Sequence, residues 1–220
     1  MKILTSLAMG SLILACTIVA MSSEEKTGMT ADQAMKNLVE GNDRFVSGNV
    51  VHPDQSISER RAEVVSAQHP FAVVVTCSDS RVPPEIVFDQ GLGDIFVVRT
   101  AGEVMDNVTL GTIEYAVDHL NVPLVLVLGH DGCGAVEAAV SGGGAPGHIA
   151  DLVEAIKPAV ETAKGMKGDL LNNSIDVNTQ NIVYELKSSQ PILYPAVKDG
   201  MLKIVGARYH LDSGTVNVME

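Results

Sequence analysis

Two apolar runs, Phe71–Thr76 and Leu124–Leu128, constrain the fold of this 220-residue chain more than any other feature. Both are rich in β-branched side chains, which favour strands. A third run of this kind lies between them at 94–99, and the intervening segments have helical patterns. Strands that alternate with helices are typical of a parallel sheet with helices on its faces. We therefore predict an α/β fold around a central, mostly parallel sheet.

Capping and turn residues predict the remaining elements. Thr30, with Gln33 three residues later, forms a capping box that begins a helix ending near Gly48. The turn Asp212–Gly214 predicts a hairpin, so the sheet has about four parallel strands and one antiparallel edge strand. Further helices are expected at 56–67, 107–120, from 133–135 onward, 149–164, 174–188 and after Pro191, and the last two strands at 202–209 and 215–219.

Size and charge limit the possible functions. A chain of this length is sufficient for one substantial core. The formal net charge is −12 and the sequence has no cluster of Lys and Arg. Because phosphate binding requires such a cluster, we predict that nucleic acid is not a partner.

The N-terminal segment differs from the rest of the chain. Lys2 is followed by an apolar stretch, Ile3–Met21, and then by polar residues, a pattern typical of a secretory leader. We expect export to the periplasm. Two alternatives stay open: a lipid anchor on Cys16, whose preceding residues resemble a lipoprotein box, and a retained N-terminal membrane anchor. The predicted division is a leader, a linker and a single catalytic domain, at 1–22, 23–29 and 30–220.

Three potential metal ligands follow the two apolar runs. Cys77 comes directly after the first run, and His130 and Cys133 come after Leu124–Leu128. Ligands bind outside the carboxyl ends of the strands in an open parallel sheet, so we expect these side chains to meet there. Two thiolates and one imidazole leave the fourth position of a tetrahedral zinc ion open, as in catalytic sites that activate water. The alternative is a disulfide between the two cysteines.

Asp79 and Arg81 lie immediately beyond the first cysteine. Alternate residues of an extended segment point to the same side, so both side chains are expected to face the crevice with Cys77. Arg81 can clamp the Asp79 carboxylate bidentately, and the carboxylate can then orient a reacting hydroxide. A structural salt bridge that pins the loop is the alternative. The glycines of Gly129–Gly134 also allow a phosphate-binding loop, although the spacing is not that of the dinucleotide fingerprint.

Three motifs together resemble those of the β-class carbonic anhydrases: CSDSR at 77–81, FVVRTAGE at 96–103 and HDGCG at 130–134. The similarity extends from about Met35 to the end of the chain. The resemblance implies a lyase that reversibly hydrates carbon dioxide to bicarbonate and a proton. It also implies one zinc ion per subunit, held by Cys77, His130 and Cys133, with Asp79 and Arg81 as the catalytic dyad.

The same resemblance implies further site residues. Gln68, Phe96 and Tyr115 match residues that line the substrate pocket, and His119 matches a proposed proton shuttle. Without the resemblance, these would be a solvated glutamine, two core aromatics and a histidine at a helix C-terminus. The chain departs from the family pattern at Thr100, where asparagine is usual, and it contains no Trp. The bicarbonate-inhibition site that uses a tryptophan is therefore absent in its usual form, which favours an open zinc position. The alternative is the closed form of the family, in which Asp79 ligates zinc at lower pH.

The resemblance also implies a homodimer or a dimer-based tetramer, in which the N-terminal helices pack on the partner. The apolar stripe of Met35–Phe45 suits this arrangement, and it equally suits packing against the chain's own core. Two other functions use the same site: hydrolysis of carbonyl sulfide or carbon disulfide, and zinc binding without catalysis in an exported domain.

Overall fold

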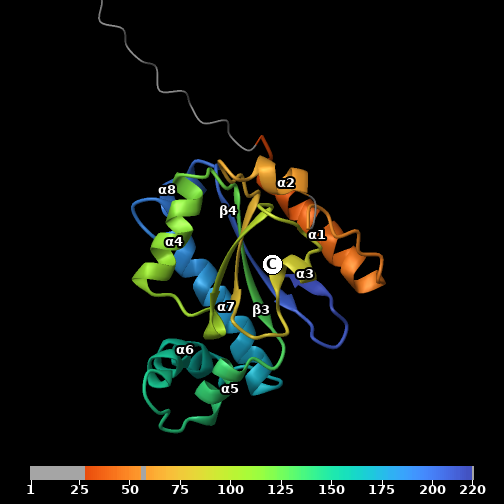
Figure 1. The fold of residues 1–220 in the computed structure, drawn as a ribbon. Helices are drawn as coiled ribbons and strands as arrows, with labels where there is room; N and C mark the ends of the chain where they lie inside the picture. Colours follow the sequence, from red (N-terminus) through yellow and green to blue (C-terminus); the bar gives the residue numbers. More distant parts are fainter. Residues whose placement is uncertain (1–27, 56–57, 220) are drawn as a thin grey trace, which may run out of the picture.

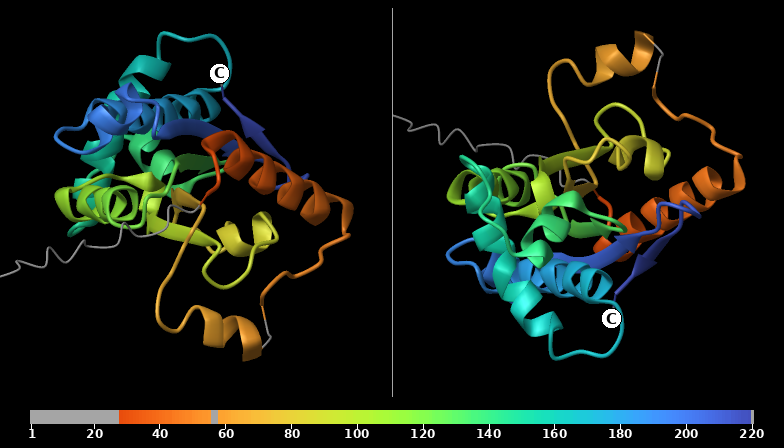
Figure 2. Two further views of the ribbon diagram at one scale, coloured as in Figure 1. Left: turned by 90° about the horizontal axis from the view of Figure 1, so that it is seen from above. Right: turned by 90° about the horizontal axis from the view of Figure 1, so that it is seen from below.

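The computed structural model describes residues 28–55 and 58–219, in which a central sheet carries helices on both faces (Figures 1 and 2). The strands are β1 (Ala72–Cys77), β2 (Ile95–Thr100), β3 (Leu124–His130), β4 (Lys203–Tyr209) and β5 (Val216–Val218). The helices are α1 (Ala31–Ser47), α2 (Ser58–Glu63), α3 (Pro84–Val87), the 3-10 helix η1 (Ala101–Glu103), α4 (Asn107–Asp118), α5 (Gly134–Ser141), α6 (Ile149–Ala163), α7 (Leu170–Ser188) and α8 (Leu193–Lys198).

The sheet has the predicted architecture. Its strand order is β2-β1-β3-β4-β5, in which β2, β1, β3 and β4 are parallel and β5 runs antiparallel to β4 at the edge. The two strands that were expected to carry the site, β1 and β3, are neighbours and are buried along their whole length. The prediction of a mostly parallel sheet with one antiparallel edge strand is confirmed.

Alternate residues of β1 enter two different cores. Val73 and Val75 pack in one core with buried residues of α4, α7 and α8, whereas Ala72 and Val74 pack in another core with α1 and α3. This alternation follows from the period of two along a strand. Figure 2 shows the two layers of helices on opposite sides of the sheet.

Helix α1 packs on the chain's own sheet. Thr30 forms the predicted capping box, and Gly48 ends the helix in the left-handed conformation. Ala34 and Leu38 are fully buried, so the apolar stripe is used within the chain. At Gly41 an added Cβ would lie 1.8 Å from the carbonyl oxygen of Phe88, so only glycine permits this close approach. Packing of α1 on a partner subunit stays a prediction.

Several elements differ from the predicted ranges. Strands β1 and β2 lie one residue later than predicted, and β3 is two residues longer, so Cys77 and His130 are the last residues of their strands. Helix α2 ends at Glu63, four residues before the predicted end, and it buries no residue that packing could stabilise. Helix α7 begins about one turn early, where the Asp169 side chain accepts a hydrogen bond from the backbone N–H of Asn172.

The predicted leader and Cys16 lie outside the described residues. Within 28–55 and 58–219, no helix combines the length and the apolar character that crossing a membrane requires.

Candidate metal centre

The three predicted ligands meet at the carboxyl ends of β1 and β3. Cys77 ends β1, His130 ends β3, and Cys133 directly precedes α5. Helix α5 lies at the lower end of the sheet in Figure 1. Their ligand atoms all lie within 4.8 Å of one another, and all three residues are buried. The convergence follows from the parallel pairing of two neighbouring strands.

The two cysteines are free thiols. Their Sγ atoms lie 3.9 Å apart, whereas a disulfide requires about 2.05 Å, so the disulfide alternative does not describe this structure. The hydrogen bond with Cys133 lowers the pKa of Cys77 to about 4, against the opposing effect of burial. The same hydrogen bond, together with burial, raises the pKa of Cys133. The backbone N–H of Gly102 also donates to the Cys77 Sγ atom at 3.3 Å.

The imidazole of His130 is oriented as a metal ligand requires. Its Nδ1 atom lies 2.8 Å from the main-chain oxygen of Asp131. Because a carbonyl can only accept, Nδ1 carries the proton and Nε2 has a free lone pair. This Nε2 atom is buried and has no hydrogen-bond partner in the described part of the chain. Nitrogen and sulfur are ligand atoms that zinc prefers. A bound zinc ion would also satisfy the buried Nε2 atom, which otherwise has no partner.

Asp79 and Arg81 form the predicted pair beside this cluster. Arg81 donates from Nε to Oδ1 at 2.9 Å and from Nη2 to Oδ2 at 2.7 Å, and its backbone N–H also reaches Oδ1. These hydrogen bonds hold the pKa of Asp79 well below its usual range. The Oδ2 atom lies 4.0 Å from Nε2 of His130. Asp79 therefore reaches the metal centre as an ionised carboxylate.

The segment that carries this pair is a turn. The backbone N–H of Val82 donates to the Asp79 carbonyl at 3.1 Å, so the chain does not continue as the extended strand that the sequence suggested. Asp79 nevertheless faces the cluster. The ion pair also pins this loop, because Nη2 of Arg81 donates to the Gly132 carbonyl at 3.3 Å.

Two residues near the metal centre were not predicted from the sequence. Arg99, on β2, donates to the main-chain oxygens of Cys77 at 2.9 Å and of Asp79 at 2.6 Å. Glu103 is buried, and its Oε1 atom has no hydrogen-bond partner among the described residues. Burial, and then the negative charge of Cys77, raise the pKa of Glu103 well above its usual value. Both belong to the motif at 96–103, and their positions depend on the pairing of β1 with β2.

The predicted pocket residues form a separate group within one chain. The rings of Phe96 and Tyr115 have centroids 6.5 Å apart, and His119 packs edge-on against Tyr115 at 5.0 Å. Phe96 pairs with Val73, four residues before Cys77, which corresponds to about 13 Å along the strand. A single chain therefore does not bring this group to the metal cluster. Gln68 is exposed on the segment before β1.

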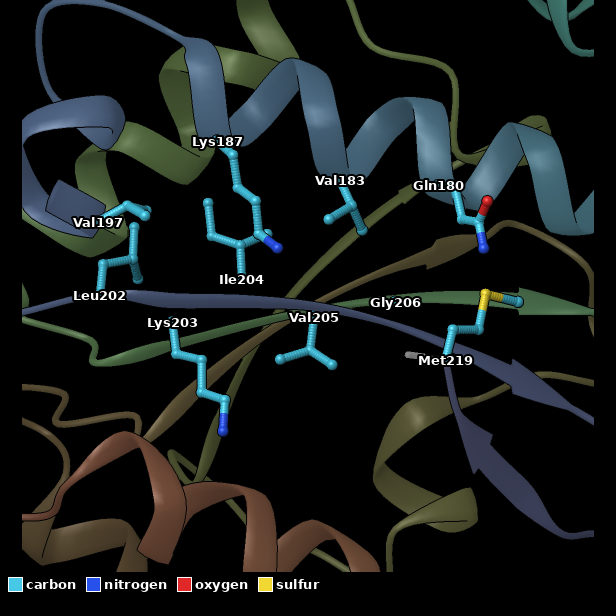
Figure 3. Close-up of a pocket in the computed structure, with 10 residues that line it drawn as sticks. All are labelled: Gln180, Val183, Lys187, Val197, Leu202, Lys203, Ile204, Val205, Gly206 and Met219. Atoms are coloured by element: carbon cyan, nitrogen blue, oxygen red, sulfur yellow. The ribbon is translucent and has the colours of Figure 1, made fainter. Parts of the chain in front are cut away.

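A hollow of about 410 Å³ lies elsewhere, over the outer part of β4 (Figure 3). Residues of α7 form one wall, including Val183 and Lys187, and Met219 lies at one end opposite Gln180. These positions belong to the edge of the sheet, and the sequence suggested no chemistry for them.

The fold and the Cys–His–Cys cluster define an α/β protein with a candidate metal centre at the carboxyl ends of its strands. The family model described as carbonic anhydrase matches residues 72–216. Carbonic anhydrase 2 of Mycobacterium tuberculosis is 48% identical over 189 residues, which cover 82% of this chain and 89% of that protein. The chain belongs to the carbonic anhydrase family.

Solved structures agree with this assignment. A β-carbonic anhydrase of Coccomyxa, solved in complex with acetazolamide, matches with a TM-score of 0.66 and 25% identity, over 84% of this chain and 86% of that one. A tetrameric β-carbonic anhydrase of Sordaria macrospora has the same fold, with a TM-score of 0.65 and 21% identity, over 84% of this chain and 96% of that one.

Proposed function

We propose that this protein catalyses the reversible hydration of carbon dioxide to bicarbonate and a proton. The observation that carries the proposal is the buried set of Cys77, His130 and Cys133, with the carboxylate of Asp79 4.0 Å from the free Nε2 atom. Membership of the carbonic anhydrase family supports the same reaction.

The three ligand residues would hold one zinc ion per subunit. When bound, zinc acidifies water and so supplies hydroxide near neutral pH. The two thiolates would neutralise the formal charge of the ion. The hydrogen bond from Nδ1–H of His130 to the Asp131 main-chain oxygen fixes the tautomer that leaves Nε2 free. All three residues are buried, and their ligand atoms lie within 4.8 Å of one another, so they could share a single ion.

Asp79 orients the reacting hydroxide. The bidentate bond from Arg81 keeps the Asp79 carboxylate ionised, so it can only accept hydrogen bonds. By accepting a hydrogen bond from the hydroxide, the carboxylate would direct an oxygen lone pair towards the carbon of carbon dioxide. Arg81 also donates to the Gly132 carbonyl, which ties the loop of Asp79 to the loop of His130 and Cys133. Together these contacts preorganise the site before substrate arrives.

We further propose that the substrate pocket is completed by a second copy of the chain, in a homodimer or dimer-based tetramer. Phe96 lies too far along β2 to reach the metal centre of its own chain, and Tyr115 of α4 packs beside it. Tyr115 is 46% exposed, so its side chain is free to face another subunit. Gln68 would supply an amide donor in the same pocket. His119, which is exposed beside Tyr115, would pass the proton to buffer.

Export is a proposal of its own. The leader pattern at 1–22 and the polar linker at 23–29 support secretion to the periplasm, with 30–220 as the catalytic domain. Cleavage, a lipid anchor on Cys16 and a retained anchor predict different N-termini. Mass spectrometry of the protein from membrane and soluble fractions distinguishes them.

Stopped-flow measurement of carbon dioxide hydration, beside determination of the zinc content, tests the proposed reaction. We expect about one zinc per chain and rapid hydration. Parallel assays with carbonyl sulfide and carbon disulfide separate this activity from hydrolysis at the same site. Stoichiometric zinc without hydration at any pH up to about 9 would instead favour a non-catalytic zinc-binding domain.

A further inference from the structure

Asp131, the residue after His130, is held by a charged network that the proposed mechanism does not use. Arg208 of β4 donates from Nε to Oδ1 of Asp131 at 2.7 Å, and Nη2 lies 2.6 Å from the same oxygen. The other oxygen, Oδ2, lies 3.1 Å from Nδ1 of His210. The carboxylate of Asp131 is not part of the ligand set, so its contacts serve another purpose.

Arg208 is itself firmly held. Its side chain is 9% exposed, and Nη1 donates to Oδ1 of Asp176 at 2.8 Å and to the main-chain oxygen of Asn172 at 3.0 Å. The Nη2 atom donates to Oδ1 of Asn172 at 2.6 Å. Asn172 and Asp176 lie on α7, which packs against β3 and β4. The guanidinium group is therefore a fixed point between the helix and the sheet.

The backbone of Asp131 connects this fixed point to the metal centre. Its carbonyl accepts the Nδ1–H of His130 at 2.8 Å, and its N–H donates to the Tyr209 carbonyl at 3.1 Å. Asp131 is therefore held at three points. Arg208 binds its side chain, the Tyr209 carbonyl of β4 accepts its N–H, and Nδ1 of His130 donates to its carbonyl. Groups that accept the second N–H of a ligating histidine set its tautomer and ring orientation.

We propose that Arg208 and Asp131 are positioning residues for the metal centre. By holding the Asp131 carbonyl against Nδ1–H, the pair keeps Nε2 of His130 directed towards the thiols of Cys77 and Cys133. The inference rests on the proposed zinc site. In this inference, Asp131 and Arg208 help to retain the metal and take no part in proton transfer.

Asp131→Ala tests this role, with Asp176→Ala as its matched control. Both variants remove one carboxylate partner of Arg208. Only Asp131 lies in the loop between the proposed ligands His130 and Cys133, whereas Asp176 lies on α7. We expect Asp131→Ala to raise the dissociation constant for zinc about 10- to 100-fold, and Asp176→Ala to leave it within about twofold of wild type. Competition with a chromophoric chelator measures the constant in the full-length protein. The visible spectrum of the cobalt(II)-substituted protein reports any change in ligand geometry.

Thermal unfolding of the metal-free proteins separates positioning from general stability. The proposal predicts weaker zinc binding in Asp131→Ala even when the Tm values of the two metal-free variants are equal. Equal zinc affinity in the two variants, or losses that only follow Tm, would overturn it. If Asp131→Ala does not fold, Asp131→Asn replaces it. We expect this variant to bind zinc more weakly than wild type, and unchanged zinc affinity would overturn the inference. Wild-type protein that binds no zinc would instead refute the proposed function itself.

Discussion

Arg81 engages both carboxylate oxygens of Asp79, with Nε 2.9 Å from Oδ1 and Nη2 2.7 Å from Oδ2. This fork keeps the carboxylate ionised and fixes its direction beside His130. A carboxylate held in this way accepts a hydrogen bond without reorganising, which is the property that an orienting group needs.

Replacement of Asp79 by asparagine should separate zinc binding from catalysis. The amide can donate as well as accept, so it no longer selects one orientation of the hydroxide. We expect Asp79→Asn to retain zinc and to lower kcat about 100-fold or more. Stopped-flow hydration and metal analysis measure the two effects. Asp43→Asn, which changes an exposed carboxylate on α1, is the control and should hydrate carbon dioxide at the wild-type rate. Full activity in Asp79→Asn would exclude the role assigned to the carboxylate.

Loss of a zinc ligand should remove the metal and lower stability. His130→Ala deletes the buried Nε2 atom, so the zinc content should fall to near zero, with no hydration activity. Removal of zinc from wild type with a chelator should lower the free energy of unfolding. Because zinc binds only the folded state, the expected loss of unfolding free energy is about 4 kcal/mol when the free zinc concentration before removal is 1,000 times the Kd. His148→Ala changes a fully exposed histidine and is the control. Unchanged zinc content in His130→Ala would contradict the ligand assignment.

Local patterns account for what the sequence predicted well. The fully apolar runs identify β1 and β3, and the spacing from Cys77 to Asp79 and Arg81 places the dyad within one short loop. The capping box at Thr30 likewise depends only on residues three apart. These features require no knowledge of how distant segments meet.

Contacts between distant segments could not be predicted in this way. Arg208 lies 77 residues from Asp131, and their contact depends on the register between β3 and β4. Arg99 reaches the Cys77 carbonyl only because β2 pairs with β1. The resemblance assigned Phe96 to the substrate pocket, but only the strand register reveals its distance from the metal centre of the same chain.

Arg44 and Asp89 should stabilise the fold in a pH-dependent manner. The Asp89 side chain is fully buried, and Oδ2 lies 2.6 Å from Nε of Arg44. Burial alone would raise the pKa of Asp89, but hydrogen bonds from Arg44 and from the backbone N–H groups of Val51 and His52 lower it overall. We expect Arg44→Met to reduce the free energy of unfolding by about 2 kcal/mol at pH 7, because a buried carboxylate loses its counter-ion.

The sign of the pH effect follows from the lowered pKa. The stabilisation from Asp89 is complete above its unfolded pKa of about 4 and is lost as the pH falls through the lower, folded value. The difference between wild type and Arg44→Met should therefore shrink on going from pH 7 to about pH 3 in urea unfolding. Lys36→Met, which breaks an exposed pair with Glu40, should change stability by about 0.5 kcal/mol or less. A difference that grows in acid would contradict the assignment to Asp89.

Mixed dimers test whether the substrate pocket is shared between subunits. The Cys77→Ala variant cannot hold zinc but keeps the aromatic rings of Phe96 and Tyr115. The double variant Phe96→Ala/Tyr115→Ala keeps the metal ligands but lacks both of these rings. Each homodimer should be nearly inactive. If Phe96 and Tyr115 serve the partner's metal centre, a heterodimer contains one intact site.

The heterodimer, purified by two different affinity tags, should therefore hydrate carbon dioxide at about half the wild-type rate per dimer, since one of two symmetric sites is restored. Zinc analysis of the same sample should give one ion per dimer, located in the subunit with intact ligands. If the aromatic group instead serves its own chain, neither site of the heterodimer is complete, and its activity should equal the mean of the two parents. That second outcome would exclude a shared pocket while leaving the zinc ligands and the dyad unaffected.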